Sequence, residues 1–151
     1  MIEFFGDENF SPRILRILDE YDTSNKVSWL PNFLKNNDFG NEGRAVSDIV
    51  WLEFMASVKP DCVIISNDDR IPRNPSERQT LIESNLMFIA LSNQWGHFDL
   101  ENQVVHIIRA WKYILSEIKN AKEPSLIYIK FKKGHNRPVI ENHGKTRNLK
   151  L

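Results

Sequence analysis

The sequence predicts a single α/β domain of three layers, in which helices cover both faces of a central, mostly parallel sheet of about five strands. Two observations support this class: short apolar runs alternate along the chain with segments whose apolar residues recur at helical spacing. The length of 151 residues fits one domain with a substantial core. A hydrophobic share of 41% and a charged share of 26% are ordinary values for a globular protein.

The strands are predicted from apolar runs whose length suits buried strands. The run from Cys62 to Ile65 is the strongest of them, because a continuous apolar run is typical of a central strand in a parallel sheet. The predicted strands cover residues 2–5, 27–30, 62–65, 86–91 and 126–131.

The helices are predicted from their start signals and from stripes of apolar residues. Ser11 and Pro12 form an N-cap followed by a first helical residue, and residues 74–77 (Asn-Pro-Ser-Glu) have the form of a capping box. Apolar residues recur at helical spacing from Leu100 to Ile118, which indicates one long amphipathic helix. The predicted helices cover residues 12–22, 31–36, 48–57, 75–83 and 100–118, and residues 38–47 are predicted to form a loop.

The charges are unevenly distributed, although the formal net charge is zero. Residues 132–151 contain six basic residues and one acid, so this tail carries about five positive charges and residues 1–131 carry about five negative charges. We expect residues 1–131 to form the domain and residues 132–151 to be a flexible basic tail. Such a tail suits a polyanionic partner, and it suits equally well a solvated segment that keeps the protein in solution.

The sequence favours a cytoplasmic protein that is not attached to a membrane. No apolar run approaches the roughly 20 residues that a membrane-spanning helix needs, and the first residues lack the regions of a secretory signal. Cys62 is the only cysteine, which excludes an internal disulfide and suits a reducing compartment. Its place in an apolar run predicts a buried structural thiol.

Acidic residues follow two of the predicted strands. Asp7 follows the first strand and Asp68 follows the strand at 62–65, so a parallel sheet brings both to the carboxyl edge, where ligands bind in such folds. Asp48 begins a predicted helix that we expect to face the same edge. Clustered carboxylates repel one another unless a cation lies between them, and oxygen ligands suit Mg²⁺ or Mn²⁺. The sequence therefore predicts a metal site formed by Asp7, Asp48 and Asp68.

Further polar residues beside these turns are predicted to support the chemistry. Asn9 and Ser66 would orient the metal ligands by hydrogen bonds. Arg70 or Arg73 would bind a phosphate oxygen, for which the guanidinium group is well shaped. Trp95 lies in a polar loop after a strand, and it is the tryptophan that we expect to touch a substrate or a partner.

Simpler explanations exist for two of the three acids. Asp48 follows Ser47, a common helix start at which an acid interacts favourably with the helix dipole. Asp68 and the residues after it also fit a plain surface turn with an ion pair to Arg70. Asp7, directly after an apolar strand, is the hardest of the three to explain without a function.

Three segments, in chain order, resemble the PIN-like nuclease family. Residues 5–13 (Phe-Gly-Asp-Glu-Asn-Phe-Ser-Pro-Arg) resemble the opening signature of its toxins, and residues 66–70 (Ser-Asn-Asp-Asp-Arg) resemble their acidic turn. Residues 71–77 (Ile-Pro-Arg-Asn-Pro-Ser-Glu) are similar to a stretch of one PIN-like subgroup. The resemblance covers roughly residues 2–115.

This resemblance implies a PIN-like α/β/α fold and a VapC-type ribonuclease, the toxin of a toxin–antitoxin pair. It also implies Mg²⁺ or Mn²⁺ as cofactor and commonly a homodimer that a small antitoxin protein inhibits. By motif position, the acidic site comprises Asp7, Asp48 and Asp68, with Asn9 and Ser66 in support. Full PIN nucleases often carry a fourth acid, and the candidates here are Asp69 and Asp99.

Two functions therefore remain open from the sequence. The acids at two strand ends favour a metal-dependent endoribonuclease that hydrolyses RNA phosphodiester bonds. The zero net charge and the incomplete acid set leave open a non-catalytic PIN-like module that binds RNA or a protein. A phosphoacceptor receiver domain does not fit, because no aspartate directly ends the second or third apolar run.

Overall fold

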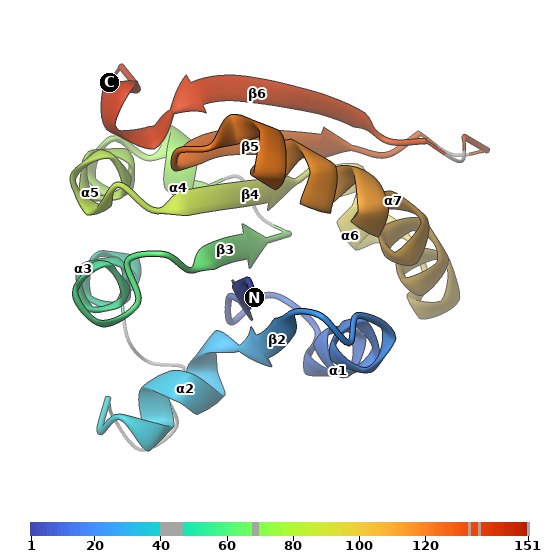
Figure 1. Ribbon diagram of the computed structural model, residues 1–151, viewed down its shortest axis with the longest axis horizontal. Coiled ribbons are helices and arrows are strands. Elements are labelled where there is room, and N and C mark those ends of the chain that lie inside the picture. The colour runs from blue at the N-terminus through green and yellow to red at the C-terminus, as the bar shows by residue number, and fades with distance from the viewer. Residues whose placement is uncertain (40–46, 68–69, 133, 136, 151) are drawn as a thin grey trace.

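The computed structural model describes residues 1–39, 47–67, 70–132, 134–135 and 137–150. Within these residues it contains a six-stranded sheet in the order β2-β1-β3-β4-β5-β6. Neighbouring strands run parallel, except for the antiparallel pair β5 and β6. Helices pack on both faces of this sheet (Figure 1). The predicted three-layer α/β class is confirmed, with one strand more than expected.

Every predicted strand and helix is present at nearly the predicted bounds, and α4, α6 and β6 are additional. The strands are β1 Glu3–Gly6, β2 Lys26–Trp29, β3 Val63–Ser66, β4 Met87–Leu91, β5 Ser125–Lys130 and β6 Val139–Lys145. The helices are α1 Pro12–Tyr21, α2 Leu30–Asn36, α3 Asp48–Val58, α4 Arg70–Arg73, α5 Pro75–Ser84, α6 Asn93–His97 and α7 Leu100–Ala121, with a 3₁₀ turn, η1, at Thr146–Asn148. The predicted loop at 38–47 lies largely outside the described residues.

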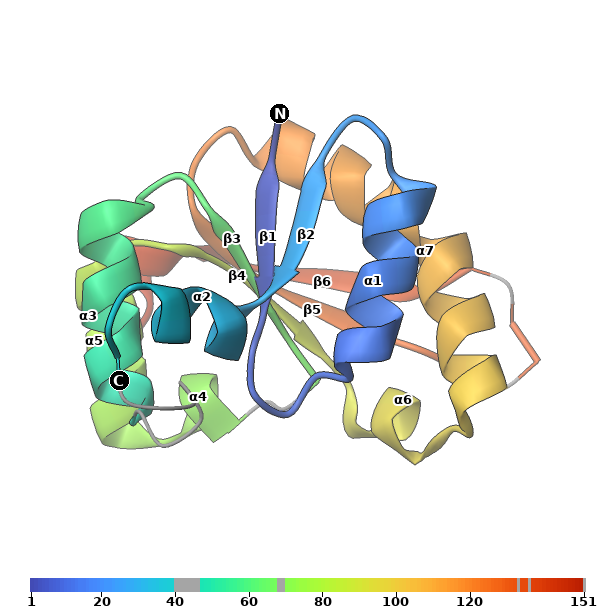
Figure 2. The same cartoon turned by 90° about the horizontal axis from the view of Figure 1, so that it is seen from below.

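Two apolar layers enclose the sheet, because successive residues of a strand point to opposite faces. Phe4 packs on the side of α1 and α7, with its ring centroid 4.7 Å from that of Trp111. Phe5 packs on the side of α2, α3 and α5, with its ring centroid 5.0 Å from that of Phe33. Figure 2 shows these two groups of helices on either side of the strands.

The expectation of a flexible tail from residue 132 onwards is wrong for residues 139–148. Residues 139–145 form β6, which pairs with β5, and the buried Thr146 hydroxyl donates a hydrogen bond to the Leu86 carbonyl oxygen at 2.7 Å. Lys145 forms an ion pair with Glu123 at 2.7 Å. The sequence did not indicate this strand because β6 is an outer strand whose side chains are mostly exposed, so it lacks apolar alternation.

Cys62 is buried, as predicted for a structural thiol. Burial, reinforced by the negative charge of Glu3, raises the pKa of this thiol to about 12, so it stays protonated and unreactive at neutral pH. Among the described residues, no helix has both the length and the apolar character that crossing a membrane requires.

Asp22 joins the end of α1 to the middle of α7. Its carboxylate, only 8% exposed, accepts hydrogen bonds from the backbone N–H groups of Ser24 and Asn25, from the Asn25 amide and from the Trp111 indole N–H. Burial acts to raise the pKa of Asp22, but these hydrogen bonds, led by those from the Asn25 and Trp111 side chains, outweigh it and lower the pKa.

We predict that Asp22→Asn lowers the free energy of unfolding by about 1–3 kcal/mol at neutral pH. The Asn amide nitrogen cannot accept the hydrogen bonds that the Asn25 and Trp111 side chains donate to one carboxylate oxygen. Urea unfolding monitored by circular dichroism measures the change. Glu20→Gln, an exposed change on the same helix, is the control and is expected to shift stability by less than about 0.5 kcal/mol.

The same pair of proteins also tests the pKa of Asp22. Because its pKa is lower in the folded state, the stability that Asp22 contributes is present above its unfolded pKa and is lost as the pH falls through the folded pKa. The difference between wild type and Asp22→Asn is therefore expected to shrink below about pH 4. A difference that stays constant down to about pH 2 would contradict this assignment.

Candidate functional site

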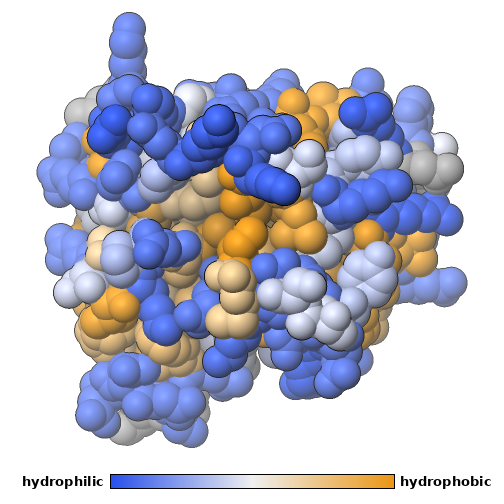
Figure 3. Space-filling view, viewed as in Figure 1, coloured by the Kyte–Doolittle hydropathy of each residue, from blue (hydrophilic) through white to orange (hydrophobic). Residues whose placement is uncertain are grey.

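The two edges of the sheet differ in character. The residues that precede β1, β3 and β4 are apolar: Ile2, Cys62 and Leu86. Ile2 and Cys62 line a hollow of about 200 Å³, together with Met87, Ile118 and Pro124. These residues lie at the amino edge of the sheet, where the parallel strands begin. Figure 3 views this edge and shows apolar side chains gathered in its middle.

Polar residues follow the same three strands at the opposite, carboxyl edge. Asp7 follows β1, Asn67 follows β3 and Ser92 follows β4. The short helices α4 and α6 and the start of α3 lie at this edge in Figure 2. In parallel α/β sheets, ligands bind at this carboxyl edge.

Asp7 is held in place at the carboxyl edge and is only 3% exposed. Its N–H donates to the Ile65 carbonyl oxygen at 3.2 Å, which extends the pairing of β1 with β3. One carboxylate oxygen accepts the N–H of Asn9 at 3.2 Å, and the other accepts the hydroxyl of the fully buried Ser66. The Asp7 carbonyl oxygen accepts the indole N–H of Trp29 at 3.1 Å. These contacts fix both the backbone and the carboxylate of Asp7.

Gly6 makes this position of Asp7 sterically accessible. A Cβ atom at Gly6 would lie 2.6 Å from a methyl carbon of Leu15, closer than real Cβ atoms approach other atoms. A larger residue at this position would therefore require the buried Leu15 side chain to shift.

Asp48 lies at the first position of α3, after the N-cap Ser47. The Ser47 hydroxyl oxygen accepts the N–H of Val50 at 3.4 Å, and the Asp48 carboxylate accepts the indole N–H of Trp51 at 2.8 Å. Asp48 also borders a hollow of about 460 Å³ whose other lining residues are Arg70, Arg73, Asn74 and Glu77. Asp48 thus lies at a helix start, which agrees with the simpler explanation that it interacts with the helix dipole. It also lines a hollow with Arg70 and Arg73, the two arginines predicted to bind phosphate.

The described site residues fall into two groups at the carboxyl edge. Asp7, Asn9 and Ser66 form the first group, and Asp48, Arg70 and Arg73 form the second. Asp68 and Asp69, which come between Ser66 and Arg70 in the chain, lie outside the described residues. In the part of the chain that is described, no three His, Cys, Asp or Glu side chains form a group that could hold a metal ion.

The donor atoms of the described residues are of the type that binds a divalent cation, but Asp7 and Asp48 belong to separate groups. Asp7 and Asp48 offer hard carboxylate oxygens, the ligand type that Mg²⁺ and Mn²⁺ prefer. The hydrogen bonds from Ser66 and Asn9 orient the Asp7 carboxylate, as supporting groups do around metal ligands.

Asp99, one of the two candidates for a fourth acid, acts as a helix cap. Its carboxylate accepts the N–H of Asn102 at 2.8 Å at the start of α7. This hydrogen bond accounts for an acid at position 99, because such residues are favoured at helix N-caps. Asp99 is therefore not needed as a metal ligand to explain the sequence.

The side chain of Trp95 belongs to the core, and the expectation that it touches a substrate or a partner stays a prediction. It borders a hollow of about 580 Å³ next to Asn9 and Asn67, but it is only 1% exposed. Its indole N–H donates to the Gln103 carbonyl oxygen at 3.0 Å, and its ring centroid lies 5.0 Å from that of Phe10.

Sequence reasoning missed Trp29, which lines the same hollow and is only partly buried. Its position at the end of a strand beside a predicted helix start was the available signal. The indole N–H that it donates to Asp7 links this tryptophan directly to the candidate site.

Comparison with known proteins identifies the family of this chain. No curated protein and no solved structure matches the chain. Residues 2–93 match the family described as PIN like domain, and this match includes β1 to β4 and the described residues of both groups at the carboxyl edge. The match covers more than half of the sequence, and the chain therefore belongs to the PIN-like domain family.

Proposed function

We propose that this chain is a metal-dependent endoribonuclease that hydrolyses RNA phosphodiester bonds. One observation carries the proposal: a buried carboxylate, Asp7, is fixed by Ser66 and Asn9 at the carboxyl edge of a PIN-like domain. Asp7 is buried, but it lies outside the two apolar layers. A buried carboxylate in such a position is typical of a residue that binds a cation or takes part in catalysis.

The metal ligands in this proposal are Asp7, Asp48 and Asp68, directly or through water, with Asp69 as the candidate fourth acid. Mg²⁺ or Mn²⁺ bound there would activate water and neutralise charge on the phosphate. Ser66 holds the Asp7 carboxylate in one orientation by donating its hydroxyl hydrogen. Arg70 and Arg73 line the hollow beside Asp48, which supports a role for them in binding phosphate oxygens. Hydrolysis forms a bond from a water oxygen to phosphorus and breaks the bond from phosphorus to a ribose oxygen of one neighbouring nucleotide. The attacking water loses a proton, and the departing ribose oxygen gains one.

We further propose a VapC-type toxin role in the cytoplasm, with a small antitoxin protein as inhibitor and a homodimer as the assembly. The motif order at residues 5–13, 66–70 and 71–77 supports this role by resemblance. The free, buried Cys62 is compatible with a reducing compartment.

A non-catalytic PIN-like module that binds RNA or a protein is the second candidate. It is favoured by the absence, in the described ranges, of three acidic or other ligating side chains grouped for a metal. The two candidates differ in one measurable property, because only the nuclease cleaves RNA when Mg²⁺ or Mn²⁺ is added.

We predict that Asp7→Asn lowers the rate of Mn²⁺-dependent RNA cleavage by about 100-fold or more, because it removes a carboxylate ligand. The amide has the same shape, and the Ser66 hydroxyl can accept as well as donate a hydrogen bond, so the fold is expected to survive. Cleavage of mixed RNAs, followed on denaturing gels with and without Mn²⁺, measures the rate. The melting temperature is expected to change by less than about 4 °C.

Asp61→Asn is the matched control for this change. Asp61 is an exposed aspartate that precedes β3, so it lies at the amino edge of the same sheet. Its replacement is expected to leave cleavage unchanged. Absence of cleavage by the wild-type chain with either metal, or equal cleavage by wild type and Asp7→Asn, would favour the non-catalytic module.

We predict that Ser66→Ala raises the Mn²⁺ concentration for half-maximal cleavage by about 10–100-fold, because the Asp7 carboxylate loses the group that orients it. Cleavage at saturating Mn²⁺ is expected to fall less than cleavage at low Mn²⁺. A titration of activity against Mn²⁺ measures both quantities.

Ser92→Ala provides the control for Ser66→Ala. Ser92 follows β4 at the same edge, but its buried hydroxyl has no hydrogen-bond partner in the described structure. Its loss is expected to leave the Mn²⁺ dependence unchanged. If both serine variants shift the titration equally, Ser66 has no specific role in orienting Asp7.

A further inference from the structure

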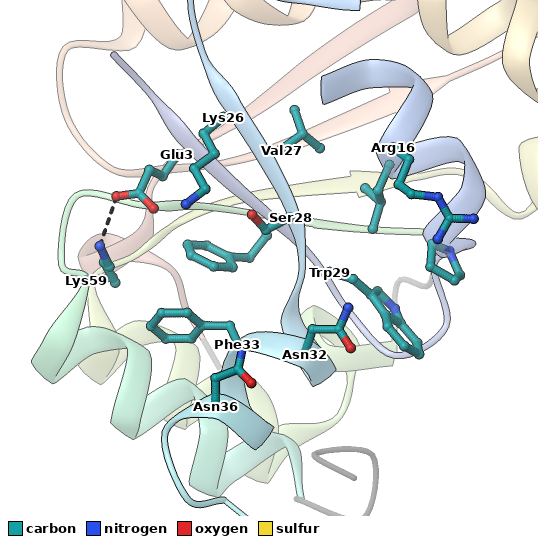
Figure 4. A pocket seen from close by; sticks show the side chains of 13 residues that line it. Glu3, Arg16, Lys26, Val27, Ser28, Trp29, Asn32, Phe33, Asn36 and Lys59 are labelled. Carbon is teal, nitrogen blue, oxygen red and sulfur yellow. Dashed lines mark hydrogen bonds and ion pairs between the residues drawn. The ribbon is translucent and has the colours of Figure 1, made fainter. Parts of the chain in front are cut away.

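A further hollow, of about 340 Å³, lies along β2 at the outer edge of the sheet. Side chains from several elements line it: Arg16 from α1, Lys26 and Ser28 from β2, Asn32 and Phe33 from α2, and Lys59 after α3. Figure 4 shows these side chains grouped around the strand.

This hollow adjoins the one beside the candidate site. Pro12 and Trp29 line both of them, and the hollow beside the candidate site also contains Asn9 and Asn67 from the turns that follow β1 and β3. Trp29, which lines both hollows, contacts the candidate site directly, because its indole N–H donates a hydrogen bond to the Asp7 carbonyl oxygen. We propose that the two hollows form one path that binds a single-stranded RNA segment and leads it to the candidate site. The proposal rests on the proposed function in taking RNA as the substrate.

The charges of the hollow along β2 favour a polyanion. Arg16, Lys26 and Lys59 line it with one acid, Glu3, which pairs with Lys59 at 2.9 Å. The hollow beside the candidate site has one acid in its lining, Glu8. Arg16 and Lys26 are exposed and have no ion-pair partner within the described residues. Two basic side chains remain to bind phosphate groups, although the whole chain has no net charge.

The uncharged lining suits the bases of a single strand. Trp29 and Phe33 are partly buried aromatic residues, and bases stack on such rings with little dependence on sequence. The side chains of Ser28, Asn32 and Asn36 add hydrogen-bond donors and acceptors of the kind that meet base edges. Cations, aromatic rings and amides in one groove are the combination that single-stranded nucleic acids require.

An added peptide strand is a poorer occupant for the same edge. The N–H of Lys26 donates to the Ile2 carbonyl oxygen within the sheet, so the N–H of the next residue, Val27, points to the open side. The Asp19 carboxylate already accepts that N–H at 2.8 Å. This hydrogen bond occupies a backbone group that a further strand would need, which protects the edge against strand addition.

The test measures binding separately from cleavage. Fluorescein-labelled oligouridine of about ten nucleotides is titrated with the full chain carrying Asp7→Asn, in EDTA, at several salt concentrations, and fluorescence anisotropy gives the Kd. Adding Arg16→Gln and Lys26→Gln is expected to weaken binding by about tenfold at low salt. The slope of log affinity against log salt is expected to fall by about 1.4, since each phosphate contact to a single strand contributes about 0.7.

The control carries Lys119→Gln and Lys150→Gln, which remove two exposed positive charges elsewhere on the surface. The proposal stands if the Arg16 and Lys26 pair weakens binding and flattens the salt dependence while the control pair does not. The proposal is overturned if both pairs of substitutions weaken binding equally, or if neither pair weakens it. It is also overturned if the Asp7→Asn chain does not bind the oligonucleotide. If the wild-type chain binds RNA along this path but does not cleave it with Mn²⁺, the result contradicts the proposed nuclease function. The proposal of an RNA-binding path then still stands.

Discussion

The candidate site depends on the parallel pairing of β1 with β3. Gly6 lies opposite Ile65 in this pairing, and Asp7 extends it by donating its N–H to the Ile65 carbonyl oxygen. Ser66 then ends β3 at the point where its hydroxyl reaches the Asp7 carboxylate. A shift of one residue in this register would turn the side chains to the opposite faces and separate the two groups.

The distribution of charge over the surface says more about this protein than its net charge does. The described acids of the site lie at the carboxyl edge, whereas apolar side chains gather at the amino edge. Basic residues near the C-terminus pair with acids, as Lys130 does with Glu141 at 3.1 Å and Lys145 with Glu123 at 2.7 Å. A zero net charge is therefore compatible with a local groove that attracts an anionic strand.

Sequence patterns predicted the buried elements well and the polar ones poorly. Each predicted apolar run forms a strand, and its side chains pack in an apolar layer on each face of the sheet. Burial on both faces requires apolar residues at these positions. The outer strand β6 carries no such requirement, so its polar sequence gave no signal. Trp95 shows the reverse case, since a polar stretch of sequence surrounds a side chain that packs into the core.

By itself the sequence determined the alternation of strands and helices, the PIN-like family, and the meeting of Asp7 with Ser66 at one edge. These are local properties, because strand ends and apolar spacing follow from neighbouring residues. Only the tertiary structure decided that Asp48 shares a hollow with two arginines and that Trp29 lies between two hollows. Such neighbours come from separate segments, and only packing of the helices on the sheet brings them together.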